Sequence, residues 1–311
     1  MKTKKSVTAK RTSGKKLARL YAERLIIAAT KGRVSEIGSL LAKDVSIDVR
    51  DSKGLTALMA AVIAGHEKTT SFLIGSGADV NAVDEDALRA GDLYGMTPLK
   101  FAAENGNIRL LRTLLGNGAD INHDLTTRRH TAFGMAAKNG HLAAMRLLIQ
   151  AGAVIEDNAL YGPVAGGHLH VIRDLIKRGA NVNYVNAFGE PVLMTAVVRG
   201  HRAIAELLLK RDADINATQA GQTCLMRAIH KGFTDIALWL IRKGADIHVK
   251  DFGQRTALWF AAKLGNKQVV KALLQKDADI GVADVNGDTP LMVAKREGHK
   301  KIVELLQEKL G

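Results

Sequence analysis

Residues 284–306 read DVNGDTPLMVAKREGHKKIVELL and contain the pattern that decides the fold. Thr289 is followed by Pro290, and a hydroxyl N-cap before a proline at the first helical position predicts the start of a helix. Gly298 comes seven residues after Leu291, where a left-handed glycine would end that helix. The segment therefore predicts a short helix, a tight corner and a second, longer helix.

The same pattern recurs along the chain in nine units, each with a leading apolar residue and a glycine seven residues later. Successive leading residues lie 33, 41, 34, 27, 33, 32, 33 and 33 residues apart. They are Leu25, Leu58, Leu99, Phe133, Leu160, Leu193, Leu225, Leu258 and Leu291. A period of this length predicts a stack of two-helix units, each burying its apolar face against its neighbours.

The end of the second helix is also marked in eight of the nine units. A glycine stands there in five units, and Asp44, Asp212 and Asp277 replace it in three others. Aspartate is among the few side chains that tolerate a left-handed backbone. We therefore expect positive φ angles at these three aspartates.

In the third and ninth units the pattern reads Asp-x-x-Gly-x-Thr-Pro-Leu, as at 92–99 and 284–291, and Gly-Ala-Asp-Ile-Asn follows at 118–122. The chain therefore resembles the ankyrin-repeat family over about residues 25–311. The resemblance implies an all-α solenoid of nine helix-turn-helix units, with short β-hairpin fingers between them. It also implies a protein that binds other proteins through the fingers and the concave face formed by the first helices.

Two departures from the regular spacing define the organisation of the repeat domain. An insertion at 84–91 lengthens one finger, and about six residues are missing near 156–158, where a finger is shortened. Pro163 also stands where other units have alanine, so we expect the first helix of that unit to be distorted or to begin near Gly162. We predict that the joint between units four and five is the weakest of the array, or a bend in it.

Residues 1–24 form a strongly basic arm. They contain nine of the 45 basic residues and one acid, so they carry +8 of the net charge of +14. We expect a solvated, disordered arm, because blocks of like charge repel one another. A targeting signal, or a segment that binds phosphate groups, is the alternative.

The repeats leave no room for a catalytic domain, and the sequence contains none of the common catalytic or phosphate-binding motifs, so we expect no enzyme. We also expect no cofactor, no metal and no membrane-spanning segment. Five histidines follow the glycine of the first helix, and this shared place predicts a structural role. Cys224 stands where other units have proline, and we expect it to pack as a small apolar residue.

The predicted binding surface is the concave face, because it is rich in arginine, methionine and aromatic residues and contains no acid. Phe188 and Phe252 belong to it, and we expect Trp259 there to be partly exposed. The strongest candidates come from units six to eight: Arg199, Lys231, Arg255, Trp259 and Lys263. The alternative candidates are apolar and lie near the long finger: Leu55, Leu93, Tyr94 and Met96.

These features predict a non-catalytic adaptor, a cytoplasmic monomer that binds a protein with an acidic surface. Location in the nucleus or delivery to a host cell is the alternative. Binding of nucleic acid or an anionic surface through the basic arm is a second hypothesis, which predicts a steep loss of affinity with salt.

Overall fold

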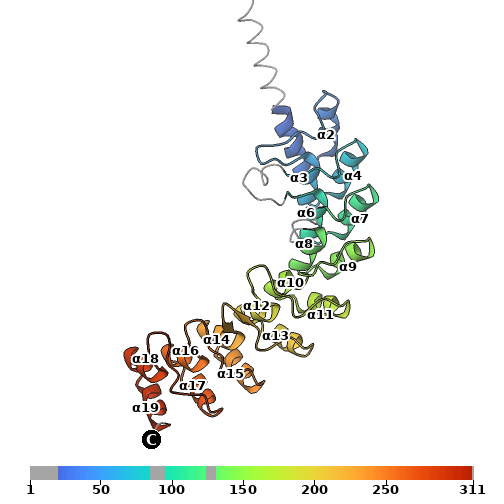
Figure 1. Cartoon of the computed structure of the whole chain (residues 1–311). Coiled ribbons are helices and arrows are strands. Elements are labelled where there is room, and N and C mark those ends of the chain that lie inside the picture. Colours follow the sequence, from blue (N-terminus) through green and yellow to red (C-terminus); the bar gives the residue numbers. More distant parts are fainter. Residues whose placement is uncertain (1–19, 85–94, 124–130, 310–311) are drawn as a thin grey trace, which may run out of the picture. The chain divides into compact units, whose positions relative to one another are not determined.

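The computed structural model describes residues 20–84, 95–123 and 131–309, and its helices follow one another in pairs (Figure 1). Each pair is one repeat, with a first and a second helix. Repeats 1 to 4 contain residues 20–30 with α2 (Val34–Leu41), α3 (Ala57–Ile63) with α4 (Glu67–Gly75), α6 (Pro98–Glu104) with α7 (Ile108–Gly116), and α8 (Ala132–Lys138) with α9 (Leu142–Gln150). Repeats 5 to 9 contain α10 (Tyr161–Gly166) with α11 (Leu169–Lys177), α12 (Val192–Val198) with α13 (Arg202–Leu209), α14 (Cys224–His230) with α15 (Thr234–Arg242), α16 (Ala257–Lys263) with α17 (Lys267–Leu274), and α18 (Pro290–Arg296) with α19 (Lys300–Glu308). The predicted all-α repeat architecture is confirmed.

The chain divides into two compact parts, 1–156 and 157–311, and the division falls at the predicted shortened finger. In each part the first helices of consecutive repeats pack side by side, as α14 does with α12 and α16. The first helix has the same place in every repeat and buries the leading residue, so Leu225 and Leu258 are completely inaccessible to water. No helix among the described residues is long and apolar enough to cross a membrane.

The predicted helix boundaries are confirmed by their caps. The hydroxyl of Thr289 accepts a hydrogen bond from the backbone N–H of Met292, and five other threonines cap their helices in the same way. The glycines seven residues after the leading residues all have positive φ, between 66° and 79°. The aspartates at the ends of second helices also adopt positive φ, with values of 56°, 64° and 56° at Asp44, Asp212 and Asp277.

The fingers contain little regular β-structure, as expected for an all-α solenoid with short fingers. Only one finger of the described chain forms paired strands, β1 (Thr218–Gln219) and β2 (Gln222–Thr223), which are antiparallel. Single bridges join Arg50 to Thr56 and Val185 to Pro191. The fingers are too short for longer ladders, and an aspartate or asparagine side chain holds the turn in several of them, as Asp284 does for Asn286 and Asp288. The inserted segment 84–91 lies, apart from Asp84, outside the described residues.

Pro163 shortens the first helix of repeat 5, as predicted. In the other regular repeats the helix begins one residue before the leading residue, but α10 begins at Tyr161, one residue after Leu160. This start places Pro163 third in the helix, where its missing N–H leaves no intrahelical hydrogen bond unmade.

Asparagine side chains link the ends of consecutive repeats. The Oδ1 atom of Asn183 accepts from the backbone N–H of Asp214 at 2.9 Å, and its Nδ2 atom donates to the carbonyl of Asp212 at 3.0 Å. Asn81 and Asn122 each make the same pair of hydrogen bonds to the repeat that follows. In repeat 4 this place is taken by Glu156, whose carboxylate instead accepts from the hydroxyl of Thr131 at 2.7 Å.

Four of the five histidines each bind the first helix of the preceding repeat from the start of a second helix, which confirms the predicted structural role for these four. His299 is the N-cap residue of α19, and its Nε2 atom lies 3.0 Å from the carbonyl of Lys263 in the preceding repeat. Its ring covers Gly265, which has a φ of +73°, so that a Cβ atom at this glycine would lie 2.7 Å from the ring. His66, His141 and His201 repeat the contact.

Replacing Gly265 by alanine should therefore cost more than the same change at Gly298. Gly298 has a φ of +77° and nothing within 4 Å of its Cβ position, so Gly298→Ala should cost only the left-handed backbone strain, about 1 kcal/mol. Gly265→Ala should also displace His299 and break its hydrogen bond, which raises the cost to about 2 kcal/mol. Urea denaturation of the two variants measures the difference, and equal losses of stability would contradict the role of the histidine.

Candidate binding surface

The finger of repeat 8 holds an arginine in a fixed position on the surface. Asp251, 3% exposed, accepts hydrogen bonds from the backbone N–H groups of Gly253 and Arg255, both at 2.9 Å. The guanidinium of Arg255 donates to Oδ2 of the same carboxylate through Nη2 at 2.7 Å and Nε at 3.0 Å. These two charge-assisted hydrogen bonds converge on one carboxylate oxygen and restrict the guanidinium to one orientation.

Opposing effects act on the pKa of Asp251. Burial of the carboxyl favours its neutral form and acts to raise the pKa, but hydrogen bonds from the side chain and backbone of Arg255 and from Gln222 act in the other direction. The hydrogen bonds prevail, so the pKa lies below its ordinary value. Asp251 is therefore ionised at neutral pH, and the ion pair with Arg255 is intact.

Arg255 is the centre of a group of cationic and aromatic side chains, which we call the Arg255 cluster: Arg255, Trp259, Phe260, Lys263 and His230. The guanidinium carbon lies 5.3 Å from the centroid of the Trp259 ring and 5.0 Å from that of Phe260. The ammonium of Lys263 lies 5.1 Å from the Trp259 ring, and the His230 and Phe260 rings are 6.2 Å apart. Three of the five strongest sequence candidates thus contact one another, within the range of cation–π attraction.

The expectation that Trp259 is partly exposed is wrong. Its side chain is only 3% exposed, because α16 packs between α14 and α18 and the cations Arg255 and Lys263 lie over its ring. Its indole Nε1 has no hydrogen-bond partner among the described residues. Trp259 therefore supports the charged groups from below, and the groups that a partner would meet are the two cations.

The other two candidates of this surface, Arg199 and Lys231, are exposed and lie just after α12 and α14, at the same place in repeats 6 and 7. Within the described part of the chain neither has an acidic partner, in contrast to Arg255. The side-by-side packing of α12, α14 and α16 orders them along one row of first helices with Lys263. Within the described chain no ion pair or cation–π contact joins the side chain of Arg199 or Lys231 to the Arg255 cluster, although Lys231 directly follows His230 in the sequence.

Two phenylalanines on the fingers are more exposed than most apolar residues of the chain. Phe188 is 73% exposed in the finger of repeat 6, and Phe252 is 80% exposed in the finger of repeat 8, next to Asp251. The sequence analysis places them on the concave face but not among its nine strongest candidates. Each phenylalanine lies in a turn that an asparagine or aspartate side chain stabilises, Asn186 for Phe188 and Asp251 for Phe252. A large apolar residue in such a turn is the sequence signal that would have ranked them higher.

The apolar alternative near the long finger is only partly described. Leu55 and Met96 are half-buried, so each offers part of its side chain to a partner. Leu93 and Tyr94 lie outside the described residues. These four candidates therefore stay a prediction.

The remaining residues with reactive side chains have structural surroundings. Burial raises the pKa of Cys224 to about 12, with a smaller contribution from Asp214, so its sulfur is a neutral thiol packed in α14. This confirms its predicted apolar role. Among the described residues no group of three or more histidine, cysteine, aspartate or glutamate side chains is arranged to hold a metal ion.

Comparison with known families agrees with this architecture. The family model for ankyrin repeats in three copies matches residues 25–124, 83–159, 101–184, 160–251 and 251–311. The chain belongs to the ankyrin-repeat family. Ankyrin repeats are in general modules of protein–protein interaction, and the predicted family is confirmed.

Two relatives of the ankyrin-repeat chain are much longer proteins. It is 28% identical over 191 residues to ankyrin repeat and KH domain-containing protein mask-1 of Caenorhabditis elegans, which covers 60% of this chain and 6% of the relative. It is 33% identical over 99 residues to ankyrin repeat and KH domain-containing protein mask of Drosophila melanogaster, covering 29% of this chain and 2% of the relative. The chain thus spans only a small part of the relatives that it matches.

Proposed function

We propose that this ankyrin-repeat protein is a non-catalytic adaptor that binds an acidic segment of a protein partner along the first helices of repeats 6 to 8. The observation that carries the proposal is the Arg255 cluster, where Arg255 and Lys263 are held over buried aromatic rings beside exposed Phe252. Arginine and aromatic side chains supply most hot spots of protein interfaces. A cation fixed before binding loses less conformational entropy when a partner carboxylate docks.

The free charges of the row add to this preference. Arg199, Lys231 and Lys263 are exposed, and none has an acidic partner among the described residues. An acidic partner would be steered to them, so association should slow as ionic strength rises. Phe188 and Phe252 on the fingers would supply apolar contacts at the edge of the charged row. We place this adaptor in the cytoplasm as a monomer, and the single buried thiol supports a reducing compartment.

The test is charge reversal at three free cations, Arg199→Glu, Lys231→Glu and Lys263→Glu together. We expect at least tenfold lower recovery of specific partners from nuclease-treated lysate, measured by quantitative mass spectrometry. A matched control with the same change of charge uses Arg211→Glu, Lys271→Glu and Lys301→Glu, which are exposed and lie on or directly after the second helices. Circular dichroism confirms that both variants are folded.

The outcomes distinguish the proposal from its alternatives. The proposal is supported if the triple variant loses partners that the control variant keeps, and if those partners carry acidic segments at the mapped contact. Unchanged capture by the triple variant would overturn it and favour the apolar candidates Leu55, Leu93, Tyr94 and Met96. Capture that disappears with nuclease, or on deletion of residues 1–24, would instead favour binding of nucleic acid through the basic arm.

A further inference from the structure

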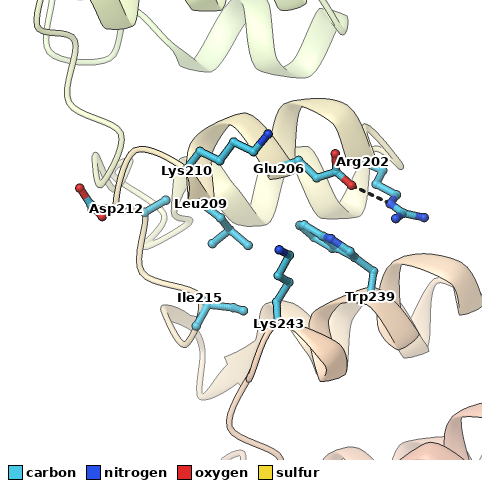
Figure 2. Close-up of a pocket in the computed structure, with 9 residues that line it drawn as sticks. Arg202, Glu206, Leu209, Lys210, Asp212, Ile215, Trp239 and Lys243 are labelled. Atoms are coloured by element: carbon cyan, nitrogen blue, oxygen red, sulfur yellow. Dashed lines mark hydrogen bonds and ion pairs between the residues drawn. The ribbon is translucent and has the colours of Figure 1, made fainter.

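A groove lies between the second helices of repeats 6 and 7. Other consecutive second helices within each part of the described chain pack closely, but α13 and α15 do so less. The indole of Trp239 of α15 lies between the two helices (Figure 2). The groove beside it has a volume of about 630 Å³ (Figure 2). It is lined by Arg202, Glu206, Leu209, Lys210, Asp212, Ala213, Ile215, Trp239 and Lys243.

The floor of the groove is apolar, and part of its rim is already paired. Trp239 is only 4% exposed, and Leu209 and Ile215 lie beside it (Figure 2). Arg202 donates to the carboxylate of Glu206 at 3.1 Å, and its guanidinium lies 5.8 Å from the centroid of the Trp239 ring. These contacts neutralise one end of the groove and leave the other end to Lys210, Lys243 and Asp212.

The two lysines direct uncompensated positive charge into the groove. Figure 2 shows the ammonium group of Lys243 turned toward the Trp239 ring and the side chain of Lys210 lying across α13 on the other side of the groove, whereas the carboxylate of Asp212 points away from both. Neither ammonium has an acidic partner within the described part of the chain. Each lysine follows the end of its helix, where the helix dipole favours a cation. The dipole accounts for the presence of each lysine, and the packing of repeats 6 and 7 places both on the lining of one groove.

We propose that this groove binds an acidic peptide segment of a protein partner. A carboxylate would lie between Lys210 and Lys243, and an apolar side chain next to it in the peptide would pack on Leu209 and Ile215, close to the buried Trp239. Binding pockets for such groups are typically apolar with a few convergent polar groups, and their volumes lie between about 300 and 1,000 Å³. The groove does not suit nucleic acid, because binding along a phosphate backbone needs a longer row of cations. The Glu206 carboxylate at the rim of the groove would also repel phosphate groups.

This groove is separate from the surface of the proposed function. It lies between second helices, whereas the Arg255 cluster lies on the first helix α16 and its finger. The chain offers a reporter for each, since its two tryptophans are Trp239 in the groove and Trp259 in the cluster. Trp259→Phe leaves Trp239 as the only indole, so its fluorescence reports on the groove alone.

The experiment selects ligands and then locates them. A displayed library of random heptapeptides is selected on full-length Trp259→Phe protein, after depletion on the same protein with Lys210→Glu and Lys243→Glu. We expect enrichment of peptides with aspartate or glutamate next to a large apolar residue. A synthetic enriched peptide should change the Trp239 emission saturably, and the double reversal should weaken its binding at least tenfold. Lys271→Glu with Lys276→Glu, two exposed lysines of repeat 8 outside the groove, is the matched control and should leave binding unchanged.

Several results would overturn the proposal. They are the absence of any enriched peptide, enrichment of neutral or basic peptides, or equal binding by the double reversal and its control. A Trp239 response to a 20-residue oligouridine without any response to an enriched peptide would assign the groove to nucleic acid instead. Circular dichroism of the double reversal variant shows whether its fold is retained. This experiment reverses no charge on the first helices of repeats 6 to 8. Its result is therefore independent of the test of the proposed function.

Discussion

Asp251→Ala should lower the free energy of unfolding by about 2–3 kcal/mol. The substitution removes the acceptor of two backbone N–H groups in the finger and leaves Arg255 without its counter-ion. Breaking a fully buried ion pair costs about 3–5 kcal/mol, but the Arg255 side chain is 34% exposed, so water compensates part of the loss. Urea denaturation at neutral pH, followed by circular dichroism, measures the effect.

The same pair should make stability depend on pH. The pKa of Asp251 is lower in the folded chain than in the unfolded chain, so its contribution is present above the unfolded value of about 4. It is lost as the pH falls through the folded value, where the carboxylate is protonated. The stability difference between wild type and Asp251→Asn should therefore be largest at pH 7 and shrink at pH 3. A difference that stays constant with pH would contradict the role of the ion pair.

A second ion pair provides the control for Asp251. Asp288 and Arg296 in repeat 9 are 2.6 Å apart, but the arginine side chain is exposed to solvent. Exposed pairs contribute little to stability, so Asp288→Ala should leave the urea midpoint nearly unchanged. A loss as large as that of Asp251→Ala would show that burial of the carboxylate is not the deciding factor.

Trp259→Ala should destabilise the chain by about 3–4 kcal/mol, because it removes a buried indole and leaves a cavity between α14, α16 and α18. Trp259→Met should cost only about 1 kcal/mol, since methionine fills irregular spaces well. Methionine also stands at this place in four other repeats: Met59, Met194, Met226 and Met292. Chemical denaturation of the two variants measures both effects.

Trp259→Met also separates packing from binding. It keeps the repeat folded but removes the ring beneath Arg255 and Lys263, so their cation–π attraction of about 1 kcal/mol is lost. We expect weaker capture of the partner by this variant, by about fivefold, with the exposed charges unchanged. Full retention of binding would mean that the indole serves packing alone and that the cations need no support.

The backbone of the repeats could be predicted from the sequence because its requirements are local. A left-handed residue must end each helix, and few residue types tolerate that conformation, so Gly265 and Asp277 could be assigned without a structure. The start of α16 could be predicted for the same reason, since the hydroxyl of Thr256 satisfies an N–H group only three residues away. Even the delayed start of α10 follows from the covalent geometry of Pro163.

The site could be predicted only in part because it depends on distances between repeats. The candidate list contains Arg255, Trp259 and Lys263, but the burial of Trp259 depends on the packing of α14 and α18 against α16. The groove beside Trp239 could not be predicted either, because it depends on how far α13 stands from α15. No pattern within one repeat contains that distance. The available signal for the groove was Trp239, the largest aromatic residue on the second helices.

The asparagine links described for Asn183 and its equivalents have an evolutionary consequence. Each link joins a side chain at the end of one repeat to backbone groups of the next, and backbone groups are the same in every repeat. A duplicated or deleted copy that ends in such an asparagine therefore keeps its connection whatever the sequence of its new neighbour. Repeat 4 ends in Glu156, which has no amide to donate, so a duplication placed after it would begin without this connection. Growth of the array by gene duplication is thus favoured after the repeats that end in Asn81, Asn122 and Asn183, and disfavoured at residue 156.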